Sequence, residues 1–127
     1  MAKAVEAGGA DAVSLINTLT GMKVDIQRKA FVLANKTGGV SGPAIHPIAV
    51  RMVYEAVNAV NVPIIGMGGI ATAEDAIEML LVGASAVSVG TANFYNPAVT
   101  MEIVDGIEKY MEAQGFASVA DMVGIVK

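Results

Sequence analysis

Two glycine-rich turns contain the residues best suited to chemistry. Gly66-Met67-Gly68-Gly69 follows the apolar run VPII, and Gly90-Thr91-Ala92-Asn93 follows ASAVSV. Each turn lies between an expected strand and an expected helix, where backbone N–H groups and the helix dipole favour an anion. One such turn is more often only a turn, but turns at two adjacent strand ends predict a phosphate site. The spacing differs from GxGxxG, so no dinucleotide-binding motif is assigned.

Two other segments are weaker candidates for binding. Asn17 and Thr18 end an earlier apolar run, and a paired amide and hydroxyl there suit a planar polar ligand. For an isolated Asn-Thr pair, ordinary strand-end turn chemistry is the simpler explanation. The loop at 38–43 (GGVSGP) leads into a helix, and it has a functional meaning only if its backbone passes close to a ligand.

Histidine and cysteine offer little chemistry. The single histidine, His46, has no neighbouring residues that make it a base or a ligand, so a surface position near a helix start is expected. The sequence contains no cysteine, which removes disulfides, thiolate metal sites and a cysteine nucleophile. No metal site is expected.

Helical and strand patterns alternate along the chain. Helical spacing or helix signals cover 2–7, 43–60, the segment from Thr72 to Gly83, and 96–115; buried strands are expected at 10–17, 62–69 and 84–90. The long polar connection at 18–42 contains VDI and AFVL, which suggest a short hairpin. This alternation predicts an α/β fold with a parallel sheet. Because a (β/α)₈ barrel needs about 250 residues, the chain is either a small open sheet or part of a barrel.

The segments 9–15 and 83–89 resemble each other, with five identical residues in seven. Shared turn chemistry between a helix and a strand explains this as well as a true duplication does. Both explanations require repeated βα units.

Composition limits the class of protein. The chain has 127 residues, 54% of them hydrophobic, and a formal charge of −4, which indicates one globular segment spanning 1–127 and argues against a nucleic-acid surface. It contains no apolar run of about 18 residues and no signal-peptide pattern, so no membrane association and a cytoplasmic location are expected.

Four motifs together resemble a known family. NT at 17–18, ANKTGGVSGPA at 34–44, IIGMGGI at 64–70 and VSVGTANF at 87–94 are similar, in order and spacing, to the C-terminal part of dihydroorotate dehydrogenases of the bacterial NAD-dependent type, class 1B. That family is an FMN-binding (β/α)₈ barrel that oxidises dihydroorotate to orotate in pyrimidine biosynthesis. The resemblance implies a partial barrel, roughly strands six to eight with flanking helices.

The resemblance also implies roles for particular residues. Asn17 and Thr18 would contact the pyrimidine substrate, and Ile16 and Gly42 would lie against the flavin. The FMN phosphate and ribityl end would be held by Gly68, Gly69, Gly90 and Thr91.

The family mechanism needs groups that this chain lacks. A cysteine base removes a proton while a hydride passes to flavin N5, and a lysine from an earlier strand lies near the flavin. Without these groups the chain alone is expected to be inactive, although it keeps the phosphate site. A partner subunit with FAD and an iron–sulfur cluster is implied for electron transfer to NAD.

Other interpretations stay open. A related flavin barrel of the dihydropyrimidine dehydrogenase type shares the Asn-Thr and glycine motifs, although the segment from 34 to 54 fits the dihydroorotate enzymes better. A non-catalytic FMN- or phosphate-binding module, or a purely structural fragment, is the alternative from another class. Three barrel strands would leave two unpaired edges and an apolar inner face, so self-association is expected.

Overall fold

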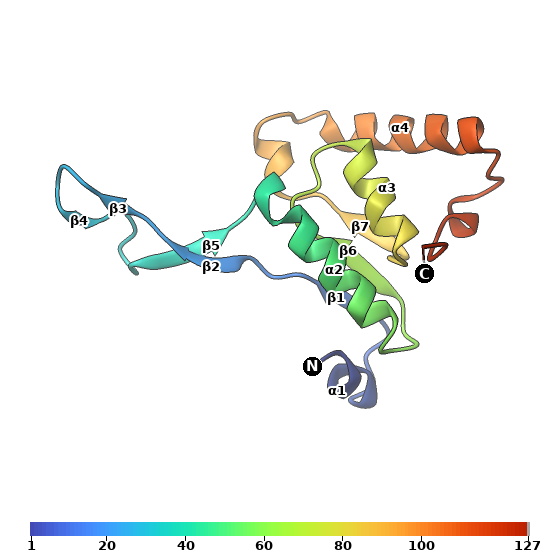
Figure 1. Ribbon diagram of the computed structural model, residues 1–127, viewed down its shortest axis with the longest axis horizontal. Coiled ribbons are helices and arrows are strands. Elements are labelled where there is room, and N and C mark those ends of the chain that lie inside the picture. The colour runs from blue at the N-terminus through green and yellow to red at the C-terminus, as the bar shows by residue number, and fades with distance from the viewer. Residues whose placement is uncertain (127) are drawn as a thin grey trace.

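A short parallel sheet forms the centre of the structure, a computed structural model that describes residues 1–126. Its strands are β1 (Val13–Leu15), β6 (Ile64–Met67) and β7 (Ala86–Ser88), in the spatial order β1-β6-β7. The order in the sheet follows the order in the chain (Figure 1). The predicted α/β class with a parallel sheet is therefore confirmed, although each strand is shorter than its apolar run.

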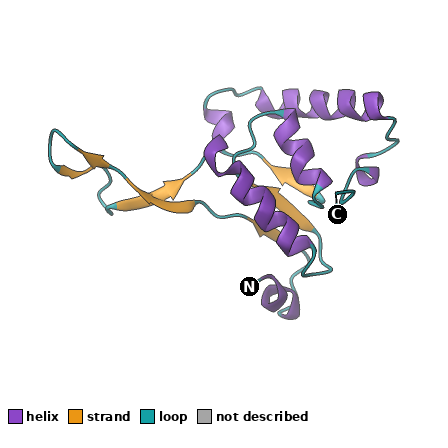
Figure 2. Ribbon diagram, viewed as in Figure 1, coloured by secondary structure: helices purple, strands orange, loops and turns teal. Residues whose placement is uncertain are grey.

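Helices precede, connect and follow these strands (Figure 2). The α-helices are α1 (Ala2–Ala7), α2 (His46–Val57), α3 (Ala73–Leu81) and α4 (Val99–Gln114). Three 3₁₀ turns are η1 (Pro43–Ile45), η2 (Thr91–Phe94) and η3 (Val119–Asp121). α2 ends at Val57, before the end of the expected helical segment at residue 60. The side chain of the next residue, Asn58, donates to the Tyr54 carbonyl 2.9 Å away.

Only one face of the sheet is covered within residues 1–126. α2 packs on β1 and β6, and α3 packs on β7 and α4. The core between them is formed by side chains exposed by at most 2%, namely Ala49, Val53, Ile64, Ala76 and Met79. The opposite face carries the register row Ser14, Ile65 and Ala86, of which the first and last are exposed. The buried strand expected at 62–69 is therefore covered on one face only, and the uncovered row combines Ser14 with two apolar residues, whereas an apolar inner face was expected.

Local capping signals behave as predicted. The Thr72 hydroxyl accepts from the Asp75 N–H at 3.3 Å, and the Asp75 carboxylate accepts from the Thr72 N–H at 3.0 Å, which forms the expected capping box. Gly9 and Gly83, the first residues of the two similar segments, both have left-handed backbones, with φ of 90° and 113°. Shared turn chemistry is thus sufficient to explain the similarity.

A two-stranded arm extends away from the sheet (Figure 1). Its base pairs β2 (Leu19–Met22) with β5 (Thr37–Val40), and its tip pairs β3 (Val24–Asp25) with β4 (Ala30–Phe31), both antiparallel. The tip confirms the expected hairpin, whereas the base was missed. The arm exposes many apolar side chains, including Met22, Val24, Ile26, Phe31 and Val32.

The C-terminal segment was also missed. Met122 is fully buried beside Ile77 and Leu80, and the Gly124 N–H donates to the Leu80 carbonyl at 3.0 Å. None of the helices described in residues 1–126 is long and apolar enough to cross a membrane.

We expect the chain to self-associate, because within residues 1–126 β1 and β7 each pair on one side only and apolar side chains of the arm are exposed. Ala86→Lys adds a charge to the uncovered sheet face on an edge strand, and should lower the associated fraction measured by light scattering at micromolar concentration. Ala113→Lys, on the exposed side of α4, is the matched control. A monomeric mass for the unmodified chain would contradict the expectation.

Candidate functional site

A cavity of about 300 Å³ lies at the carboxyl ends of β6 and β7. This is the edge of a parallel sheet where ligands commonly bind. Of the residues expected from the sequence, the cavity gathers Ile16, Thr18, Gly42, Gly68, Gly69, Gly90 and Thr91. Residues that follow β1, that lie in the loop before α2 and that form both glycine turns therefore meet at one place.

Asn17 is the expected site residue that the structure places elsewhere. It lines a second hollow of about 720 Å³ beside α1 and the free edge of β1. Its side-chain oxygen accepts from the Thr18 N–H at 2.9 Å, which is strand-end turn chemistry. Neighbouring residues of an extended chain point to opposite sides, so the predicted pair is divided between the two hollows.

The cavity wall presents backbone donors. The hydrogen bonds among residues 1–126 include none donated by the N–H groups of Gly69, Ile70 or Gly90, and all three residues line the cavity. Ile70 is only 4% exposed, and a buried N–H without an acceptor is costly. An anion with several oxygens would satisfy these donors.

The start of α3 does not supply the anion site that the helix-dipole argument predicts. The Asp75 carboxylate already accepts from the N–H groups of Ala71 and Thr72, at 2.9 and 3.0 Å. A carboxylate at this position satisfies the helix end and repels a second anion. An anion in the cavity would therefore depend on the turn before α3 and on the Gly90 turn.

The glycines of the two turns are required for different reasons. Gly68 and Gly69 have φ of 131° and 70°. A Cβ at Gly69 would lie 2.8 Å from the Gly42 carbonyl oxygen and 2.8 Å from the backbone nitrogen of His46. Gly90 has a negative φ, and a Cβ there would have no protein atom within 4 Å. Packing explains the glycines of the first turn, whereas no packing contact explains glycine at position 90, where the space belongs to the cavity.

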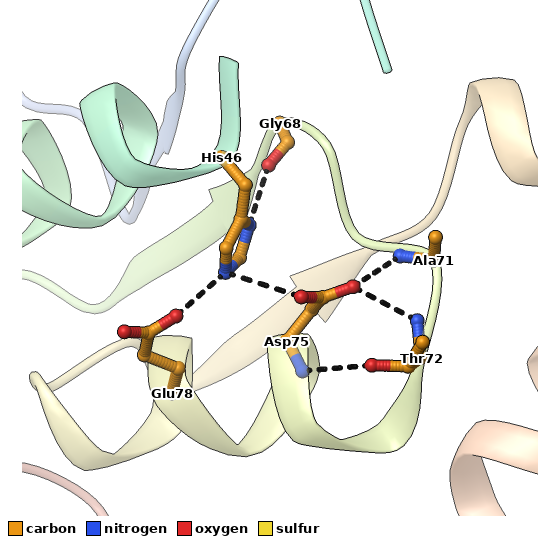
Figure 3. A network of polar contacts seen from close by, with 6 residues as sticks. All are labelled: His46, Gly68, Ala71, Thr72, Asp75 and Glu78. Carbon is orange, nitrogen blue, oxygen red and sulfur yellow. Dashed lines mark hydrogen bonds and ion pairs between the residues drawn. The ribbon is translucent and has the colours of Figure 1, made fainter. Parts of the chain in front are cut away.

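His46 is buried, which corrects the expected surface position. It begins α2 as expected, yet it is only 5% exposed. Its Nδ1 lies 2.9 Å from the Gly68 carbonyl oxygen, and its Nε2 lies 3.0 Å from Glu78 Oε2 and 3.8 Å from Asp75 Oδ1 (Figure 3). These partners lie 22 and more residues away in sequence, so local pattern could not reveal them.

Several cavity residues were not predicted. Ser41, Tyr95 and Asn96 add polar groups to the wall. Ser41 adjoins Gly42, and the other two follow the Gly90 turn directly, so proximity to a glycine motif was the available signal. Asn93 secures that turn by donating to the carbonyls of Val89 and Gly90, at 2.8 and 3.1 Å.

The wall suits a phosphate ester better than a metal ion. About 300 Å³ is at the lower end of ligand cavities, enough for the phosphate end of a nucleotide-sized molecule. Backbone donors without acceptors and the room beside Gly90 fit a phosphate group. Residues 1–126 contain no group of three or more His, Asp or Glu side chains placed to hold a metal.

Comparisons with known proteins point to one family. The family model described as dihydroorotate dehydrogenase matches residues 1–111. The dihydroorotate dehydrogenase B (NAD(+)) catalytic subunit of Lachnoclostridium phytofermentans is 63% identical over 127 residues, covering 100% of this chain and 42% of the relative. The subunit of the same name from Alkaliphilus oremlandii is 60% identical over 124 residues, covering 98% and 41%.

A solved structure has the same fold over nearly the whole chain. The crystal structure of DHODH from Eimeria tenella in complex with ferulenol superposes with a TM-score of 0.79 at 28% identity. The match covers 98% of this chain and 33% of that one. The chain therefore has the fold of a portion of that enzyme, and it spans about 42% of the length of the curated relatives.

Alanine substitutions should distinguish the packing role of Gly69 from the role of Gly90, which leaves space in the cavity. Gly69→Ala should lower the free energy of unfolding by about 2–4 kcal/mol, because a left-handed residue gains a Cβ against fixed backbone atoms. Gly90→Ala, the matched control, should change it by less than about 1 kcal/mol. Urea denaturation measures both, and equal destabilisation would show that this division is wrong.

Proposed function

Because the chain belongs to the dihydroorotate dehydrogenase family, we propose that it supplies the FMN-phosphate part of an enzyme that converts dihydroorotate to orotate in pyrimidine biosynthesis. The observation that carries the proposal is that Gly69, Ile70 and Gly90, whose N–H groups have no acceptor among residues 1–126, all line one cavity. These donors come from two turns separated by about twenty residues of chain, so a bound phosphate would tie β6 to β7.

The remaining expected residues extend the site toward the substrate. Thr91 begins η2 beside Gly90 and would complete the phosphate end. Ile16 is 6% exposed and lines the cavity with Gly42, so both would give the flavin an apolar and close-fitting wall. Thr18 would present its hydroxyl to a pyrimidine, with Asn17 joining it only if its side chain leaves its turn. When bound, FMN supplies the hydride acceptor for the oxidation.

The position within the barrel is a finer proposal. The order of the four motifs supports strands six, seven and eight of the barrel, and this assignment stays a prediction. The parallel order β1-β6-β7 is the order that consecutive barrel strands take.

The chain alone does not supply the complete reaction. It contains no cysteine, the residue type of the base that the family resemblance implies. Its relatives are named as catalytic subunits. We infer that a partner subunit carrying FAD and an iron–sulfur cluster serves the whole enzyme, and that NAD is the final acceptor.

A second candidate keeps the binding site without the reaction. A non-catalytic FMN- or phosphate-binding module would use the same open N–H groups, and it would also lack a base. A dihydropyrimidine dehydrogenase type of barrel is less favoured, since the curated relatives are named for the dihydroorotate enzyme.

FMN binding tests the proposed site directly. Titration followed by flavin fluorescence should give saturable binding of FMN, and riboflavin should bind at least about tenfold more weakly because it lacks the phosphate that accepts charge-assisted hydrogen bonds. Gly90→Ala should lower FMN affinity while leaving riboflavin binding almost unchanged. Equal affinity for the two flavins would refute a phosphate site.

Turnover should be negligible for the purified chain with FMN and dihydroorotate, since loss of a general base typically costs about 10²–10⁴ in rate. Orotate formation monitored by absorbance provides the measurement, with a full-length relative as the positive control. Turnover within about tenfold of that control would contradict the assignment of the base to a missing cysteine.

A further inference from the structure

His46 joins three parts of the structure beside the turn at Gly68 and Gly69, which we call the phosphate turn. Its ring reaches from the first residue of α2 to the Gly68 carbonyl and to Glu78 on α3 (Figure 3). Asp75 is the other charged group near the ring, 3.8 Å from Nε2. Among the described residues, α2, η1 and the glycine turn add no other charged contact.

The partners assign the hydrogens of the ring. A carbonyl oxygen can only accept, so Nδ1 donates to Gly68. Nε2 lies 3.0 Å from Glu78 Oε2, so the ring connects the Gly68 carbonyl on one side to α3 on the other.

The contact with Gly68 fixes the direction of a cavity donor. The Gly68 carbonyl and the Gly69 N–H belong to the same peptide unit, which is trans. In a planar trans peptide these two groups point in opposite directions. Holding the carbonyl toward His46 thus turns the Gly69 N–H away from His46, and Gly69 is one of the cavity residues whose N–H has no acceptor among residues 1–126.

We propose that His46 is a positioning residue for the phosphate turn, an inference that rests on the proposed FMN-phosphate function. The ring holds the Gly68–Gly69 peptide through Nδ1 and is itself anchored to α3 through the contact of Nε2 with Glu78. Without the Nδ1 contact this peptide would be free to rotate, and the affinity of the turn for an anion would fall.

Selective ¹⁵N labelling of histidine and glycine gives the first test, because His46 is the only histidine. In the ligand-free chain we expect the ring to carry a proton on Nδ1, and we expect the Gly69 amide shift to change in His46→Gln, which loses the contact with Gly68. A ring protonated on Nε2 alone, or a Gly69 amide shift that is unchanged in His46→Gln, would overturn the proposal.

Two variants separate the two contacts. His46→Asn keeps a donor near the position of Nδ1, whereas His46→Gln keeps one near the position of Nε2. Sulfate serves as the anion probe. His46→Asn should bind sulfate within about twofold of the unmodified chain, and His46→Gln should bind it about 3- to 10-fold more weakly.

Equal weakening by both variants would indicate a merely structural role and would overturn the proposal. If the variants fail to fold, the position of the proton on the ring of the unmodified chain still decides it. Failure of the proposed function is seen separately: sulfate and FMN would then leave the Gly69 and Gly90 amides of the unmodified chain unmoved.

Discussion

The close contact between the turn after β6 and the start of α2 is the constraint on which the candidate site depends. A Cβ at Gly68 would lie 2.7 Å from the Ala49 Cβ, and one at Gly69 would lie 2.8 Å from the Gly42 carbonyl oxygen. Only glycine permits this approach, and the left-handed backbone at both positions requires it as well. Because the turn is pressed against α2, it also brings Gly42 to the cavity.

This packing separates structural from binding roles within one sequence motif. Asp75 satisfies the first N–H groups of α3, so the helix end is stable without a ligand. The N–H groups of Gly69 and Ile70 precede that capping box and stay open. Gly90, which no packing contact restricts, gives the cavity its room. The sequence left open whether this turn is structural or binds a ligand. In the structure one side of the turn packs against α2, and the other side lines the cavity.

Local signals predicted much of this arrangement, and distant contacts account for the rest. The capping box at Thr72 and the strand ends at the two glycine turns follow from short patterns, and the structure gathers the expected cavity residues there. The burial of His46 depends on partners on another helix and turn, which no local pattern contains. The arm base was missed because Gly21, Gly38 and Gly39 are poor strand formers whose pairing is set across the arm. The resemblance to a known family supplied the substrate and the cofactor, which geometry alone does not name.

The central claim is that the two glycine turns together hold the phosphate of FMN. A crystal structure of the chain with FMN tests it most directly. The account predicts phosphate oxygens within about 2.7–3.2 Å of the backbone nitrogens of Gly69, Ile70 and Gly90. A phosphate bound outside this cavity, or one held at the first turn of α3 after displacement of the Asp75 carboxylate, would contradict it.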